Sequence, residues 1–201
     1  MRISLRGSAL GLALALMVAC LASAKSMQVV YTVNPAVALK NYTVLLVVND
    51  RRGLKDLVGP AARGRGLFPE LRADRFDLKI EMPDGSEVLM TNLPTQEAVR
   101  EAVGRRLTAR GVAVTAQRPA AQLTVEVDIR TFMIDMADGD LMATVNLTAK
   151  VYRDASAVTS SDALVTSSRL KLLGGMGGNR VFSEALTQAV NDLDFSAINN
   201  Y

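Results

Sequence analysis

Two stretches in the second half of the chain alternate between apolar and polar residues. In residues 123–130, Leu, Val, Val and Ile occupy every second position, and residues 141–151 resume the alternation after a polar turn at residues 137–140. A period of two is typical of a strand with one buried and one solvated face. We therefore predict a long antiparallel hairpin with one dry and one wet face.

Further strands are predicted before and after this hairpin. Residues 43–48 are apolar in both alternating sets of positions, which favours a buried strand. Residues 76–90 alternate around a Pro-Asp-Gly turn and predict a second hairpin. The pattern of residues 164–172 predicts a last strand, which is expected to bury Leu164 and to expose Arg169.

Two segments place apolar residues at positions i, i+3 and i+4, the spacing of an amphipathic helix. The first is expected to begin with Thr95 as its N-cap and to end at Gly111, with arginines such as Arg106 on its outside or at the flanks of the apolar stripe. The second is expected to begin near Asn179. The tail from Phe195 onwards is expected to fray.

These elements predict an α+β fold, namely a two-layer sandwich of a mainly antiparallel sheet with two amphipathic helices on one face. The helices must cover the dry face of the sheet. The wet face is then left to water, to a partner or to an adjacent subunit. Residues 42–201 are expected to form this single domain.

The N-terminus has the pattern of an export signal. Arg2 and Arg6 precede an apolar run that ends at Cys20, and this run is shorter than the roughly 20 apolar residues that span a bilayer. In one interpretation cleavage precedes Cys20, which becomes the lipid-acceptor residue of a lipoprotein. In the other, cleavage follows Ala24 in an Ala-Ser-Ala site and leaves a soluble periplasmic protein.

We favour lipidation of Cys20. It is the only cysteine of the chain, so no disulfide competes for its thiol. Residues 1–19 are then the signal peptide, and residues 20–41 are expected to form a lipid-anchored tether, polar and mixed over residues 25–41, in which residues 29–31 could form an edge strand. Leu21 stands where Asp usually retains lipoproteins at the inner membrane, which predicts an outer-membrane anchor facing the periplasm. The lipid bilayer is therefore the first expected partner.

Composition narrows the possible functions. The chain of 201 residues is 49% hydrophobic, enough for a sizeable core, and its net charge is +3. Loss of Arg2 and Arg6 with the signal leaves +1, which does not favour a nucleic-acid partner. The chain contains no histidine, which removes the usual zinc, copper and haem ligand sets and both Ser-His-Asp and Cys-His catalysis. We therefore expect no cofactor, no metal and no enzymatic activity.

Residues 50–75 combine many basic residues with four glycines and predict a long loop. One hypothesis is that the loop contacts an anionic lipid, lipopolysaccharide or glycan. Interleaved Asp and Glu residues favour the alternative, a solvated flexible loop. The candidate contact residues are Arg51, Arg52, Lys55, Arg63 and Arg65.

Other patterns are weaker candidates for chemistry. The glycine-rich segment 174–178 precedes a helix, but its spacing fits neither a dinucleotide-binding motif nor a P-loop. The aspartates around Gly139 lack the closing Glu of an EF-hand and favour a hairpin turn. Glu126 and Asp128 share the wet side of a strand, where carboxylates are ordinary. Methionines that flank the turn predict either core packing or a small exposed apolar tip: Met133, Met136 and Met142.

Several segments between residues 93 and 196 occur in the order and spacing of a known family. They are the helix end Leu107-Thr108-Ala109-Arg110-Gly111-Val112, the strands at residues 123–127 and 143–149, and a helix containing Ala189-Val190-Asn191. With the signal pattern and Cys20, they resemble the YajG-like family of bacterial lipoproteins. This resemblance implies an envelope lipoprotein without an established biochemical activity. Cys20 is therefore the only functional residue that the resemblance transfers to this chain.

We therefore expect a non-enzymatic envelope lipoprotein that acts as a binding or structural module in the periplasm. Its partner would be another envelope protein or an anionic envelope polymer, reached through the wet sheet face or the basic loop. The alternative is an accessory lipoprotein subunit of an envelope transport or secretion assembly. A cell-wall hydrolase is disfavoured because the chain lacks histidine and has no evident acid–base pair.

Overall fold

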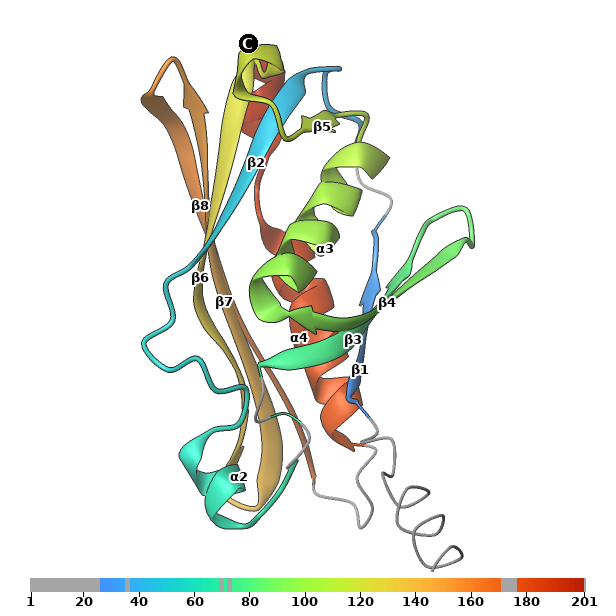
Figure 1. Ribbon diagram of the computed structural model, residues 1–201, viewed down its shortest axis with the longest axis vertical. Coiled ribbons are helices and arrows are strands. Elements are labelled where there is room, and N and C mark those ends of the chain that lie inside the picture. Colours follow the sequence, from blue (N-terminus) through green and yellow to red (C-terminus); the bar gives the residue numbers. More distant parts are fainter. Residues whose placement is uncertain (1–25, 35–36, 69–70, 72–73, 171–176, 201) are drawn as a thin grey trace, which may run out of the picture.

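The computed structural model describes residues 26–34, 37–68, 71, 74–170 and 177–200. These residues form two sheets, one of five strands in the order β5-β2-β6-β7-β8 and one of three strands in the order β1-β3-β4. Three α-helices accompany the sheets, and two of them pack on the five-stranded sheet (Figure 1). Within the described part of the chain, none of these helices has the length and apolar character needed to cross a membrane.

The five-stranded sheet is dominated by its three longest strands. β6 pairs with β7, and β7 pairs with β8, both in antiparallel register, whereas β2 runs parallel to both of its neighbours. The turn between β6 and β7 has positive φ at Asp138 (52°) and Gly139 (91°), the conformation that matches the twist of a tight hairpin. The predicted central hairpin is therefore confirmed. The strands are β2 (Thr43–Asp50), β5 (Ala113–Thr115), β6 (Leu123–Ala137), β7 (Asp140–Arg153) and β8 (Ser156–Leu170).

The smaller sheet contains the second predicted hairpin and one strand from the predicted tether. β3 (Arg75–Glu81) pairs antiparallel with β4 (Glu87–Pro94), and β1 (Gln28–Thr32) runs parallel to β3. Val29 and Tyr31 of β1 are fully buried. This part of the segment assigned to a tether therefore belongs to the folded domain, which begins near Met27 rather than at residue 42.

The free edge of β1 is closed by side chains of a helix. Along α4 (Gly177–Asp192), three polar residues lie four positions apart and face the backbone of β1. Ser183 Oγ accepts from the amide of Val30 at 2.8 Å, and Thr187 Oγ1 accepts from that of Thr32 at 3.2 Å. Asn191 Nδ2 donates to the carbonyl of Thr32 at 3.2 Å. These bonds satisfy backbone groups that an open strand edge would expose.

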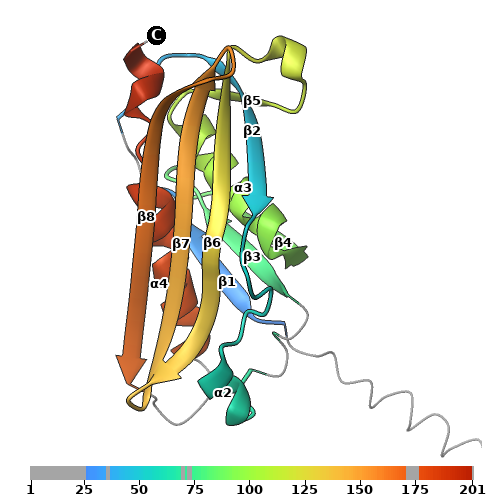
Figure 2. The same ribbon diagram turned by 90° about the vertical axis from the view of Figure 1, so that its left-hand side faces the viewer.

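The helices α3 (Thr95–Ala109) and α4 lie on the same side of the five-stranded sheet (Figures 1 and 2). The small sheet lies on this side too, and the third helix, α2 (Pro60–Gly64), packs at the end of β6. An α+β architecture with mostly antiparallel strands therefore holds at the level of fold class. The second sheet, the parallel pairs and the third helix were not predicted.

Aromatic side chains join the two sheets and α4. The rings of Phe76 in β3 and Phe132 in β6 stack with centroids 5.6 Å apart, and Phe182 of α4 lies 5.0 Å from Phe132. A bulge between Ile129 and Thr131 shifts the alternation of β6 by one residue. Because of this shift, Phe132 points to the buried side, as Ile129 does before the bulge.

The predicted parity of β8 is wrong. Leu164 is 67% exposed, whereas Ala163 and Val165 are buried, because Val165 pairs with buried Val145 of β7. The strand pairing, and not the size of individual side chains, selects the buried set. Arg169 consequently lies on the helix side, where it bonds Glu184 of α4.

The predicted roles of Thr95 and Arg106 in α3 are also wrong. Pro94 occupies the N-cap position, and the Thr95 hydroxyl instead donates to Asp74 Oδ1 at 2.6 Å. Arg106 is only 5% exposed. Its guanidinium donates to backbone carbonyls at the end of α4, including that of Leu193 at 2.7 Å, and its charge complements the helix dipole there.

The C-terminal tail is packed rather than frayed. Phe195 and Ile198 are fully buried, and residues Ser196–Asn200 form a 3₁₀ turn. The ring of Phe195 lies 5.2 Å from the guanidinium carbon of Arg106, a cation–π distance. The tail therefore helps to cover the buried arginine.

Candidate functional site

The predicted lipidation site, Cys20, lies outside the described residues, so the anchor stays a prediction. The structure does place the point where the folded domain begins. Met27 is 3% exposed and its backbone carbonyl accepts from the amide of Asp77 in β3 at 2.8 Å. The chain is therefore held to the domain from Met27 onwards.

Arg52, one of the five basic candidates, is used inside the domain. Its side chain is 2% exposed and binds Asp50 at 2.8 Å and Asp74 at 2.9 Å. Burial alone would raise the pKa of Asp50, but hydrogen bonds from Arg52 and Lys55 outweigh it and hold that pKa well below its ordinary value. Arg52 thus joins two loop segments to the end of β2 and is not presented to an outside ligand.

The other four basic candidates are not gathered into one patch. Arg51 lies 3.5 Å from Asp128 on β6, and Lys55 lies 2.9 Å from Asp50. Arg63 and Arg65 belong to α2 and its C-cap, which pack near Asp135 at the far end of β6. Asp135 lies seven residue steps along β6 from Asp128, which corresponds to about 23 Å of strand. Contact of this segment with an anionic ligand stays a prediction for the exposed members.

The face of the five-stranded sheet that points away from the helices is the broadest candidate surface (Figure 2). We call it the outer sheet face. On its strands, polar side chains alternate with the buried apolar set, and Thr148 of β7 donates to Asp162 of β8 at 2.7 Å. Its central members are Thr124, Glu126, Asp128, Thr144, Asn146, Thr148, Tyr152, Asp162, Leu164 and Thr166.

The two carboxylates that share this face are tied into a polar network. The amide nitrogen of Asn49 lies 2.5 Å from Glu126 Oε1 and 3.1 Å from Asp128 Oδ1. Arg51 and Arg130 approach Asp128 from either side at 3.5 and 3.4 Å. In the described part of the chain, no cluster of His, Cys, Asp or Glu side chains has the geometry of a metal site. These contacts stabilise the strand ends and leave the carboxylates engaged.

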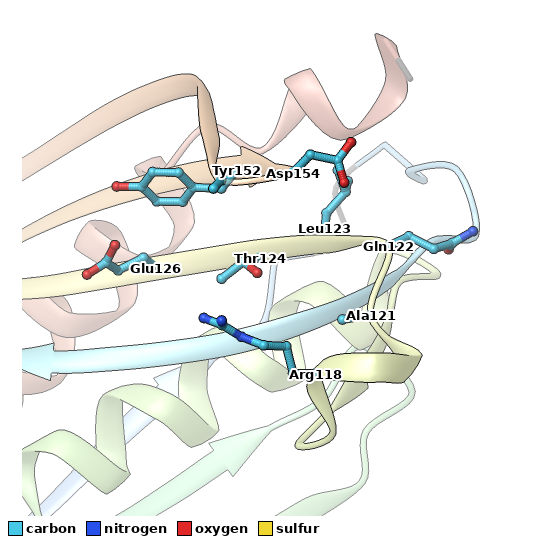
Figure 3. A pocket seen from close by; sticks show the side chains of 9 residues that line it. Arg118, Ala121, Gln122, Leu123, Thr124, Glu126, Tyr152 and Asp154 are labelled. Atoms are coloured by element: carbon cyan, nitrogen blue, oxygen red, sulfur yellow. The ribbon is translucent and has the colours of Figure 1, made fainter.

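A pocket of about 460 Å³ opens at the end of this face, beside the β7–β8 turn. Figure 3 shows Glu126 and Thr124 on β6 between Tyr152 on one side and Arg118 on the other. Partial desolvation, a hydrogen bond to Glu126 and nearby negative charge raise the pKa of Tyr152 above its ordinary value. The pocket thus offers donors and acceptors for recognition of a polar group.

The weaker sequence candidates have structural roles where the structure describes them. Asp135 accepts from the amide of Ala62 at 2.8 Å and caps α2 from across the chain. Residues 174–176 lie outside the described part. Gly178 lies in α4, where a Cβ would come within 2.5 Å of the Phe68 ring, so close packing requires glycine there. Met136 is buried, whereas Met133 and Met142 are half-buried on the outer sheet face.

No protein-family model and no curated protein sequence matches this chain. Solved structures do. Protein XCC0632 from Xanthomonas campestris, a DUF330 protein, has a TM-score of 0.52 and 19% identity over 81% of this chain and 90% of that chain. The dodecamer of a PelC variant from Paraburkholderia phytofirmans has a TM-score of 0.44 and 13% identity over 82% and 92%. Lipoprotein GNA1162 from Neisseria meningitidis has a TM-score of 0.28 and 11% identity over 75% and 98%.

Of these similarities, the one to XCC0632 bears on the fold of the chain. The fold is shared with XCC0632 along most of both chains, but at 19% identity the likeness extends to the fold alone. The other two matches are too distant in geometry to support an argument. Nothing in the comparisons is specific to the YajG-like family, so that resemblance stays a prediction.

Proposed function

We propose that this chain is a non-enzymatic envelope lipoprotein, anchored in the outer membrane through Cys20, whose outer sheet face binds another envelope protein. The observation that carries the proposal is the contrast in cover between the two faces of the five-stranded sheet. The inner face is packed against α3 and α4, and Phe76 of the small sheet stacks on Phe132 of β6, whereas Figure 2 looks directly onto the outer face. A long sheet face that the described helices α3 and α4 leave open is a natural docking surface.

The chemistry of the outer sheet face supports a protein partner over a charged polymer. Leu164 is 67% exposed, and half-buried Met133, Met142 and Tyr152 accompany it. Apolar and aromatic side chains surrounded by threonines and a few charges are typical of a protein–protein interface with a polar rim.

The anchor is supported by the sequence of the first twenty residues, in which an apolar run ends at the only cysteine. Cys20→Ala is the direct test. The substituted protein is expected to move from the membrane fraction to the soluble fraction or to remain unprocessed. Membrane association and processing identical to those of the natural protein would contradict the anchor.

Site-specific photo-cross-linking tests the binding surface. A photoreactive residue in place of Leu164, on the edge strand β8 of the outer sheet face, is expected to capture one envelope protein in intact cells. The matched control replaces Leu89 of β4, which is 57% exposed but lies in the other sheet. Capture of the same protein equally well from both positions would contradict the proposed face.

The identity of the captured protein separates the two forms of the proposal. A stoichiometric transport or secretion component would identify an accessory subunit. Any other envelope protein would identify a separate binding module. Release of soluble fragments from purified cell-wall polymer by the purified protein, lost on changing Glu126→Gln, would contradict the non-enzymatic part.

A further inference from the structure

The connection between the predicted anchor and the folded domain is shorter than the tether predicted from the sequence. Only six residues separate Cys20 from Met27, which is already buried against the small sheet. Seven Cα–Cα steps reach at most about 25 Å, whatever their conformation. This inference rests on the proposed anchoring through Cys20.

The folded domain begins close to one end of the molecule. A Cβ on Gly178, in the first turn of α4, would meet Met27 at 3.0 Å and Phe68 at 2.5 Å. A Cβ on Gly177 would lie 3.3 Å from Leu141, at the start of β7. The start of β1, the start of α4, the segment after α2 and the β6–β7 turn therefore lie together, at the lower end of the molecule in Figures 1 and 2. We call this the anchor end.

The domain is longer than this connection. β6 contains 15 residues, which corresponds to about 50 Å of strand, and it runs from the opposite end of the molecule to the anchor end. The short 3₁₀ helix Arg118–Ala120 and the pocket beside it lie at that opposite end. A chain of about 25 Å that starts at the anchor end cannot hold the domain upside down, because the anchor end would then lie about 50 Å above the bilayer surface.

The anchor end carries basic side chains on an exposed helix. Arg65, the C-cap of α2, is exposed. Arg63 is half-exposed, pairs with Asp56 at 2.6 Å and also donates to the carbonyl of Val58. Basic residues held within a Debye length of a bilayer are attracted to anionic headgroups.

We propose that the anchor end faces the bilayer, that Arg65, with Arg63 beside it, contacts anionic phospholipid headgroups, and that the pocket near Arg118 points away from the membrane. Two of the five basic residues singled out in the sequence thus share one lipid-facing location. The outer sheet face then stands upright from the membrane, with its pocket at the distal end.

Quenching by headgroup-labelled lipid tests this orientation. The full, processed lipoprotein is reconstituted in vesicles of phosphatidylcholine and phosphatidylglycerol, and its lipidated Cys20 leaves no free thiol. Arg65→Cys and Arg118→Cys form a matched pair, since each replaces one exposed arginine at one end of the molecule. A fluorophore at position 65 is expected to be quenched several-fold more strongly by a headgroup nitroxide lipid than one at position 118. Equal quenching, or stronger quenching at position 118, would overturn the orientation.

Two further measurements separate the effect of the short tether on the orientation from the effect of the basic charges. Insertion of about twenty Gly and Ser residues after Ser26 lengthens the flexible connection and is expected to weaken the difference between the two positions. A fluorophore on Ala61→Cys, an exposed position of α2, leaves Arg63 and Arg65 in place, and in vesicles of phosphatidylcholine alone its quenching is expected to fall because the anionic headgroups are missing. Unchanged quenching there would overturn the headgroup contact. Failure of the protein to float with any vesicle would instead refute the anchor itself.

Discussion

The two faces of the five-stranded sheet are built by alternating residues of the same strands, yet they have opposite surroundings. On the inner face, Val145 and Val165 pair across β7 and β8 and are buried under α4. On the outer face, Thr144 pairs with Thr166, and their hydroxyls lie 3.3 Å apart in an exposed position. Stability and contact are thus divided between the faces: the inner face holds the fold, and the outer face is the surface that we propose for binding.

The largest expected effect on the free energy of unfolding comes from a substitution on the inner face. Phe132→Ala removes a fully buried ring that stacks on Phe76 and touches Phe182, and it should lower the free energy of unfolding by about 3–5 kcal/mol. Leu164→Ala on the outer face should change it by less than about 0.5 kcal/mol. Urea unfolding followed by circular dichroism measures both. Similar losses for the two variants would contradict the division between the faces.

The second largest effect concerns Arg106, whose buried charge lies between α3 and the end of α4. Arg106→Ala removes the donors that cap the carbonyls at the end of α4, and it should cost about 3 kcal/mol because buried acceptors lose their partners. The matched control is Arg105→Ala, one residue away, whose side chain is 41% exposed and 3.9 Å from Glu101. Its expected cost is under about 0.5 kcal/mol. Equal costs would refute the capping role.

The third effect lies at the end of β2, beside the outer sheet face. Asp50→Asn should cost about 2 kcal/mol at pH 7, because Arg52 loses a charged partner in a buried position. The folded-state pKa of Asp50 is lowered, so its contribution is fully present above the unfolded-state pKa of about 4 and is lost progressively as the pH falls from there toward the folded-state pKa. The stability difference between the natural and substituted proteins should therefore be constant from pH 7 to about pH 5 and should begin to shrink between pH 4 and pH 3. A difference that stays constant down to pH 3 would contradict the ion pair.

The smallest expected effect on stability is the most informative one for function. Leu164→Asp introduces a charge at a position that is already 67% exposed, so the free energy of unfolding should change by less than about 0.5 kcal/mol. The same substitution should abolish capture of the partner by cross-linkers placed elsewhere on the outer sheet face. A partner captured as efficiently by the substituted protein would remove Leu164 from the interface.

The central hairpin was predictable because its two strands follow the period-two rule almost without interruption. Its turn contains Asp138 and Gly139, residues that favour the positive φ values observed there. The parity of β8 was not predictable, because Leu164 carries more apolar surface than Ala163 and its pairing with β7 is not visible in the local pattern. The bulge near Arg130 was likewise invisible, although it decides which face receives Phe132.

The candidate site was predictable only in outline. The alternation indicated a wet face, and that face is the one left uncovered. The pocket could not be anticipated, because Arg118, Glu126 and Tyr152 come from three separate segments. The pattern of the basic segment did not indicate that Arg52 is buried. Arg52 lies next to Arg51 in sequence, but Asp50 and Asp74 bind it inside the domain. Arg52 and Asp74 lie 22 positions apart in the sequence, so no local pattern indicates that they pair.

The sequence alone determined the alternating faces of β6 and β7 and the apolar stripes of α3 and α4, because each is a pattern of neighbouring residues. It also excluded histidine chemistry, because the composition contains no histidine. The tertiary structure decided which arginines are buried, which side of β8 faces the helices and how short the tether is. Arg106 bonds carbonyls more than 80 positions away, and Met27 is buried by segments from the middle and the end of the chain. Burial depends on such distant partners, and only the folded chain brings them together.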